Sequence, residues 1–198
     1  MSRAECPNCQ RPRVVCYCDR LPVLRNQWPV RILQELGEGR HPLNTAGIAA
    51  LSLDDCQLSA VAAGRPDFQH HIDWQRETPA LIYPGQQAEP VEALAEGPQR
   101  PLLFVDANWR KSRRLLHEMP WLSALPRFAI HDAPPSRYRI RSSRVADALS
   151  TLEAIVHTLE TVEKAPGRYA PMLDVMDWMV DQQIRYMGRE VYQRNYGQ

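Results

Sequence analysis

The fold of this chain is decided by one stretch, PLLFVDANWRKSRRLLHEM, which spans residues 101–119. Residues 102–105 form a short apolar run that is typical of a buried strand, and Asp106 ends it. A helix candidate follows at residues 109–119. A strand that leads directly into a helix is the unit of a parallel α/β sheet, whose ligands bind at the carboxyl ends of the strands. Asp106 lies at such an end.

Other apolar runs along the chain have the length and the side chains of buried strands. They are bounded by turn formers or charges and span residues 30–33, 58–62, 80–83 and 128–130. Helix candidates lie between them at residues 45–53 and 91–95. This alternation predicts an α/β fold in which a mainly parallel sheet is flanked by helices.

The last fifty or so residues predict a helical tail. Residues 150–162 form a helix candidate in which Ser150 is the N-cap and Glu153 completes a capping box. After Pro171, apolar side chains recur at helical spacing as far as Val191 and predict one further helix. We interpret its methionine-rich face as core packing, with a partner surface as the alternative. The whole chain then consists of an amino-terminal knuckle, residues 1–26, and an α/β body with its helical tail, residues 27–198.

Composition limits the kind of protein that this chain can form. Of its 198 residues, 44% are apolar and 24% are charged, which is the balance of a folded soluble protein. No run approaches the roughly 20 apolar residues that span a bilayer, and the amino terminus lacks the apolar core of a signal peptide. We therefore expect a cytoplasmic protein with no membrane partner. Residues 110–144 carry nine basic and two acidic side chains, which predicts one basic face.

Four of the five cysteines are crowded into the knuckle, at Cys6, Cys9, Cys16 and Cys18. Because cytosolic thiols are kept reduced, this spacing indicates a metal site before it indicates disulfides. Four thiolates complete a tetrahedral Zn²⁺ site and leave no open position, so the expected zinc is structural. The alternative is a set of free or partly buried thiols.

Polar residues gather in four motifs where the ends of predicted elements should converge. These are HPLNTA (41–46), DANWRK (106–111), SRYRIR (136–141) and LSTLEA (149–154). Asn44 and Thr45 can cap the helix that follows, and the N–H groups of a helix start also bind carboxylates or phosphates. Asp106 either caps a helix or is an active-site group, and Trp109 either packs in the core or stacks on a flat base.

The motif SRYRIR alternates along its length. In an extended segment Ser136 and Tyr138 share one side, while Arg137, Arg139 and Arg141 share the other. Three arginines on one face repel each other without an anion, so we expect a polyanion or an amino-acid carboxylate as their partner. The alternative is a solvated edge strand.

Taken in order, the cysteine knuckle and these four motifs resemble the DTW-domain family of tRNA-uridine aminocarboxypropyltransferases. The family is regarded as a relative of the knotted SPOUT methyltransferases, so the resemblance implies a SPOUT-like fold with a carboxyl-terminal knot that binds S-adenosylmethionine. It implies Asp106 as the catalytic residue. The residues that it implies for binding S-adenosylmethionine are Asn44, Thr45, Trp109, Ser136, Tyr138, Arg141, Ser150, Thr151 and Glu153. The basic residues that we expect to contact tRNA are Arg110, Lys111, Arg113, Arg114, Arg137 and Arg139.

The reaction that the resemblance implies is transfer of the 3-amino-3-carboxypropyl group of S-adenosylmethionine to N3 of a uridine in the variable loop of tRNA. Methylthioadenosine is the expected second product, and Asp106 is expected to accept the N3 proton or to orient the base. Two related activities stay open, a SPOUT-type RNA methyltransferase and a ribosomal-RNA aminocarboxypropyltransferase. A non-catalytic zinc-containing RNA-binding module is the alternative from another class, although it leaves Asp106 unexplained.

Overall fold

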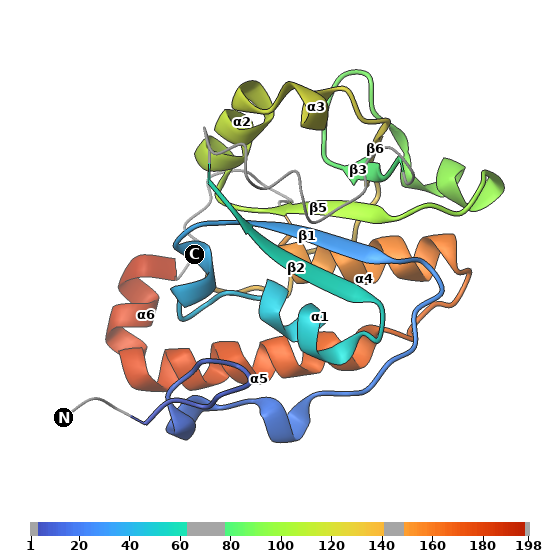
Figure 1. Ribbon diagram of the computed structural model, residues 1–198. Helices are drawn as coiled ribbons and strands as arrows, with labels where there is room; N and C mark the ends of the chain where they lie inside the picture. The colour runs from blue at the N-terminus through green and yellow to red at the C-terminus, as the bar shows by residue number, and fades with distance from the viewer. Residues whose placement is uncertain (1–3, 63–77, 141–148, 197–198) are drawn as a thin grey trace.

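A computed structural model describes residues 4–62, 78–140 and 149–196, which form a parallel sheet covered by helices on both faces (Figure 1). Along the sheet the strands follow the order β2-β1-β5-β3-β6-β4, and every neighbouring pair is parallel. The strands are β1 (Val30–Glu35), β2 (Cys56–Val61), β3 (Ala80–Ile82), β4 (Glu89–Pro90), β5 (Leu102–Asp106) and β6 (Arg127–Ala129). The predicted α/β class with a mainly parallel sheet is confirmed.

The helices form two layers, one on each face of this sheet (Figure 1). The α-helices are α1 (Ala46–Ser52), α2 (Trp109–Glu118), α3 (Pro120–Ser123), α4 (Thr151–Val162), α5 (Ala170–Met187) and α6 (Arg189–Tyr196). Short 3-10 helices are η1 (Arg13–Val15), η2 (Cys18–Arg20), η3 (Glu38–Arg40) and η5 (Val91–Glu96).

Alternating side chains of the strands build one core on each face, because neighbouring residues of a strand point in opposite directions. Ile32 and Phe104 pack with buried residues of α1, α4 and α5. Leu33 and Leu103 point to the other face and pack with buried residues of α2 and α3. Burial on both faces explains why these strands are near-continuous apolar runs in the sequence.

The expected strands are confirmed, and three local differences have physical causes. Strand β4 was not predicted, because it has two exposed residues and no apolar pattern. Residues 91–95 belong to a 3-10 helix instead of an α-helix, since Pro90 and Gly97 confine η5 to six residues. The prediction of a single helix from Pro171 to Val191 is wrong. It is divided into α5 and α6 at Gly188, whose φ of 84° lies in the left-handed region that favours glycine.

The start of α4 and the interior face of α5 are as expected. Ser150 and Glu153 form the predicted capping box. Met172, Met176 and Met179 of α5 are buried in the core, which confirms core packing as the role of the methionine-rich face. In the part of the chain that the structure describes, no helix has both the length and the apolarity needed to cross a membrane.

The knuckle contacts α5. The guanidinium of Arg20, in η2, lies 4.7 Å from the ring centre of Trp178 on α5. Residues 141–148, which lead from Ile140 toward α4, lie outside the described residues. The SPOUT-like carboxyl-terminal knot stays a prediction, as does the division into a knuckle at 1–26 and a body at 27–198.

Candidate active site and metal centre

The carboxylate of Asp106 is the centre of a hydrogen-bonded network at the carboxyl end of β5. Its Oδ2 accepts hydrogen bonds from Gln34 Nε2 at 2.9 Å and from Asn44 Nδ2 at 2.7 Å. Its Oδ1 accepts one from Thr151 Oγ1 at 2.6 Å. A carboxylate has about four acceptor positions. Three side-chain donors therefore fix its orientation, and among the described residues about one acceptor position on Oδ1 has no partner.

Four separate elements bring these side chains together. Gln34 lies opposite Asp106 in the parallel register of β1 and β5. Asn44 precedes α1, and Thr151 is the first residue of α4. Asn44, Asp106 and Thr151 were expected to be site residues, and the structure places them in contact. Gln34 was not predicted, although a glutamine within an apolar strand is a signal that pointed to it.

The structure also separates capping from the other roles of these residues. Asn108 is the N-cap of α2, with its Oδ1 accepting from Lys111 N at 3.0 Å, so the alternative that Asp106 caps this helix is wrong. Asn44 does cap α1, because its Oδ1 accepts from Gly47 N at 3.1 Å while its Nδ2 reaches Asp106. The side chain of Thr45 makes no capping hydrogen bond, contrary to expectation.

A cavity of about 610 Å³ opens at the carboxyl ends of β3, β5 and β6, beside the amino end of α4. This volume lies in the usual range for small-molecule sites, about 300–1,000 Å³. Among the predicted ligand-binding residues, Trp109, Ser150 and Thr151 line it. Tyr83 and His131 also line it and were not predicted. Because Thr151 both lines the cavity and donates to Asp106, it connects the cavity to the carboxylate network.

Trp109 forms part of the cavity wall with its indole oriented by Tyr83. The two rings meet edge to face, with centroids 5.9 Å apart. The hydroxyl of Tyr83 is in turn 2.9 Å from Ser112 Oγ on α2. The indole Nε1 of Trp109 is buried, and within the described chain it has no hydrogen-bond partner. A buried donor without a partner at a cavity wall is suited to an acceptor on a bound ligand.

Ser136, Tyr138 and Glu153 support the site without lining the cavity. The Glu153 carboxylate accepts from Ser136 Oγ at 3.0 Å, from Arg137 N at 2.6 Å and from Ser150 N at 2.7 Å. The hydroxyl of Tyr138 donates to the carbonyl of Leu43 at 2.9 Å. These contacts tie the segment around residue 137 to the start of α4 and to the loop before α1. Arg141, another predicted ligand, lies outside the described residues.

The anion that faces Arg137 and Arg139 is supplied by α5. Arg137 pairs with Asp177 and, at 2.9 Å, with Asp174, while Arg139 pairs with Asp181 at 2.7 Å. Residues 133–139 form irregular chain, so the edge strand considered for this motif is not formed. Contact of these two arginines with RNA stays a prediction, and it requires exchange of ion pairs that are largely exposed and therefore weak.

The predicted basic surface on α2 consists of exposed arginines and one paired lysine. Lys111 Nζ lies 2.7 Å from Glu35 and 3.1 Å from Glu38, and the hydrogen bond that Lys111 donates to Glu35 raises the pKa of Lys111. Its charge is therefore largely matched within the protein. Arg110, Arg113 and Arg114 are exposed, although Arg114 also pairs with Glu118.

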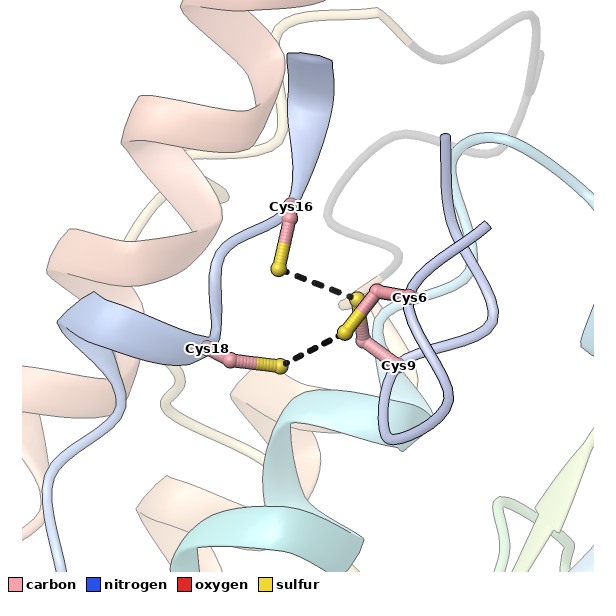
Figure 2. A group of neighbouring side chains, drawn as sticks. All are labelled: Cys6, Cys9, Cys16 and Cys18. Carbon is pink, nitrogen blue, oxygen red and sulfur yellow. Dashed lines mark hydrogen bonds between the residues drawn. The ribbon is translucent and has the colours of Figure 1, made fainter. Parts of the chain in front are cut away.

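The four knuckle cysteines converge on one point (Figure 2). Cys6 Sγ lies 3.6 Å from Cys18 Sγ, Cys9 Sγ lies 3.7 Å from Cys16 Sγ, and all four sulfurs lie within 4.8 Å of one another. A disulfide requires about 2.05 Å between sulfurs. A tetrahedral zinc with bonds of about 2.3 Å places them roughly 3.8 Å apart. The donor set and its spacing therefore fit a structural metal ion such as zinc.

The surroundings of Cys6 favour the thiolate that a metal requires. The backbone N–H groups of Cys9 and Asn8 lower the pKa of Cys6 to about 6. Burial raises the pKa of Cys18. A cation at the centre of the cluster would offset the raised pKa of Cys18, because coordination deprotonates a thiol.

Comparison with known proteins assigns the family of the chain. The family model of the DTW domain matches residues 3–184. The chain belongs to the DTW-domain family. Its DTW domain therefore includes the knuckle, the whole sheet and most of α5. No solved structure matches this protein.

Curated relatives of this DTW-domain protein share one name. It is 30% identical to tRNA-uridine aminocarboxypropyltransferase 2 of Drosophila melanogaster over 175 residues, which are 83% of this chain and 68% of the relative. The protein of the same name from Mus musculus is 26% identical over 82% of this chain, and that from Macaca fascicularis is 27% identical over 82%. The aligned region is 57% of each mammalian protein, so the chain is much shorter than these relatives.

Proposed function

We propose that this DTW-domain protein transfers the 3-amino-3-carboxypropyl group of S-adenosylmethionine to N3 of a uridine in tRNA, in the variable loop, and releases methylthioadenosine. The single observation that carries the proposal is the cavity beside Asp106, connected to it through Thr151. It lies at the carboxyl edge of a parallel sheet, where α/β proteins bind ligands. The name shared by the relatives supports the group transferred and the class of RNA.

The cavity fits S-adenosylmethionine as a substrate. Trp109 and Tyr83 provide aromatic surface for a purine, and the Trp109 Nε1 provides a donor that has no partner among the described residues. Ser150 and Thr151 place the amino end of α4 at the cavity, where the helix dipole attracts a carboxylate, although the capping box already uses the N–H groups of Ser150 and Glu153. The amino-acid part of the substrate carries that carboxylate.

The reaction needs no metal at the reacting atoms. The sulfonium makes the adjacent γ-carbon of the substrate electrophilic. A bond forms between uridine N3 and this carbon, the carbon–sulfur bond breaks, and its electron pair stays on sulfur as the neutral thioether of methylthioadenosine. The proton of N3 leaves to a base, for which Asp106 is the candidate through the remaining acceptor position on Oδ1. Positioning of the nucleophile in line with the sulfur selects this carbon over the methyl group.

Product analysis tests the proposal directly. Purified protein is incubated with unmodified tRNA and S-adenosylmethionine, and the nucleosides are then separated and weighed by mass spectrometry. We expect a uridine that carries the aminocarboxypropyl group, together with free methylthioadenosine. A methylated nucleoside would make the protein a methyltransferase, and modification of ribosomal RNA alone would change the substrate. RNA binding without affinity for S-adenosylmethionine would indicate a non-catalytic module.

Salt dependence tests the basic surface of α2. We expect affinity for tRNA to fall steeply as salt rises, because each phosphate contact releases counterions. Replacing both Arg113 and Arg114 with alanine should reduce the slope of log K against log salt by about 1 per lost phosphate contact. The matched control is Arg100→Ala, which removes an arginine that lies before β5. Binding isotherms at several salt concentrations measure the slope, and an unchanged slope would place the RNA surface elsewhere.

A further inference from the structure

The loop between β1 and α1 carries Asn44, and one side chain of the knuckle holds this loop. Arg11 Nη1 donates to the carbonyl of Pro42 at 2.6 Å, and Arg11 Nη2 donates to the carbonyl of Asn44 at 3.1 Å. The side chain of the same Asn44 donates to Asp106 at 2.7 Å. A chain of two contacts therefore leads from the knuckle to the carboxylate network.

Arg11 is itself built into the cysteine cluster. It lies between Cys9 and Cys16 in the sequence, and its carbonyl accepts from Cys6 N at 2.8 Å. Its guanidinium lies 5.0 Å from the ring centre of Tyr17, which is 2% exposed. The cation–π contact with Tyr17 and the fold around the cysteines thus limit where the guanidinium can be.

Other elements hold the same loop from other directions. Tyr138 donates to the carbonyl of Leu43, and Lys111 pairs with Glu35 and Glu38 at its start. The knuckle also packs against the first turn of α1, since a Cβ added at Gly47 would lie 3.0 Å from the Tyr17 hydroxyl. The backbone around Asn44 is accordingly clamped between the α/β body and the knuckle.

We propose that Arg11 is a positioning residue through which the cysteine knuckle orients Asn44 against Asp106. This inference rests on the proposed function and goes beyond a stabilising role for the knuckle. A planar guanidinium spans two carbonyls that a point charge cannot hold together, which explains why the contact uses arginine. Pro42 is exposed and Asn44 is half-buried, so water can replace a lost donor at these carbonyls. Loss of Arg11 should therefore leave stability largely intact and act on the reaction rate, because small displacements of active-site groups are costly.

Three variants test this role in the intact, metal-loaded protein. Arg11→Ala should lower the single-turnover transfer rate by about tenfold to a hundredfold, since a misplacement of 1 Å can cost about 10²-fold. Arg11→Lys should recover part of this loss. If the alanine variant does not fold, the transfer rate of Arg11→Lys is compared with that of the wild type instead. Arg13→Ala is the matched control, because Arg13 is an exposed arginine of the same knuckle. Metal content and the unfolding midpoint should be the same in all of them.

A double-mutant cycle with Asn44→Ala separates positioning from general stabilisation. If Arg11 acts through Asn44, Arg11→Ala should have little further effect in the Asn44→Ala background. Additive losses, or a fall in rate that follows a fall in metal content or stability, would overturn the proposal, as would an unchanged rate in Arg11→Ala.

The side-chain amide of Asn44 gives a readout that does not depend on transfer. Its NMR signals should move or broaden in Arg11→Ala and stay as in the wild type in Arg13→Ala. An inactive wild-type protein would contradict the proposed function, whereas unmoved Asn44 signals would contradict the role of Arg11.

Discussion

Replacing Asp106 with asparagine should give a folded protein that transfers the aminocarboxypropyl group roughly 10²–10⁴-fold more slowly, the usual cost of losing a general base. Asparagine has the same shape as aspartate. Its amide oxygen can accept from Gln34 and Asn44, and its amide nitrogen can donate to Thr151 Oγ1, so the three contacts of the network persist. The charge and the capacity to take a proton are lost.

Three companion measurements make this test specific. Calorimetry with S-adenosylmethionine and thermal unfolding of the same preparation should give values close to those of the wild type. Asp106→Ala should also lose stability, because it leaves the donors of Gln34 and Asn44 without Asp106 as acceptor, and the buried donor of Gln34 alone should cost about 1–3 kcal/mol. Asp55→Asn is the matched control, since Asp55 is an exposed carboxylate before β2 that pairs with Arg31. Near-normal transfer by a stable Asp106→Asn protein would assign Asp106 to positioning alone.

Short-range signals in the sequence were sufficient to predict most elements of the fold. Strand β5 is a buried apolar run bounded by Pro101 and Asp106, and the capping box of α4 lies within four residues, so local chemistry determines both. The break at Gly188 was missed because the apolar spacing of the sequence continues past this residue. The glycine, whose φ is positive, ends α5.

The partners of the site residues depend on strand order and helix docking, which local patterns do not contain. Gln34 reaches Asp106 because β1 and β5 are neighbours in the sheet, although 72 residues separate the two side chains. Arg137 and Arg139 were expected to need an anion, and the aspartates of α5 that supply it lie 37 to 42 residues later. Each motif was visible in the sequence, while its partner appeared only with the fold.

The knuckle should depend on a bound metal more than the α/β body does. Its described secondary structure consists of the short helices η1 and η2, in which no residue is buried, and of bridge residues such as the pair Glu5 and Pro12. It therefore lacks an apolar core of its own, and small units of this kind are usually folded by metal or disulfides. In zinc-finger peptides a structural zinc contributes about 10–16 kcal/mol of apparent binding free energy, which is folding free energy.

Replacing Cys9 with serine should therefore remove the zinc and unfold the knuckle while the sheet stays folded. The freshly purified wild-type protein should contain about one equivalent of zinc by elemental analysis, because four thiolates close a single tetrahedral site. Cys9→Ser should fall far below this content. Its thermal midpoint should fall by roughly 2–4 °C for each kcal/mol that the knuckle contributes to the stability of the body through contacts such as Arg20 on Trp178.

Cys56→Ser is the matched control. Cys56 lies on β2 outside the cluster, and burial raises the pKa of its thiol to about 12. The zinc content of Cys56→Ser should therefore match that of the wild type. If the reduced wild-type protein contained no zinc when freshly purified and its knuckle were folded, the four thiols would fold the knuckle without a metal.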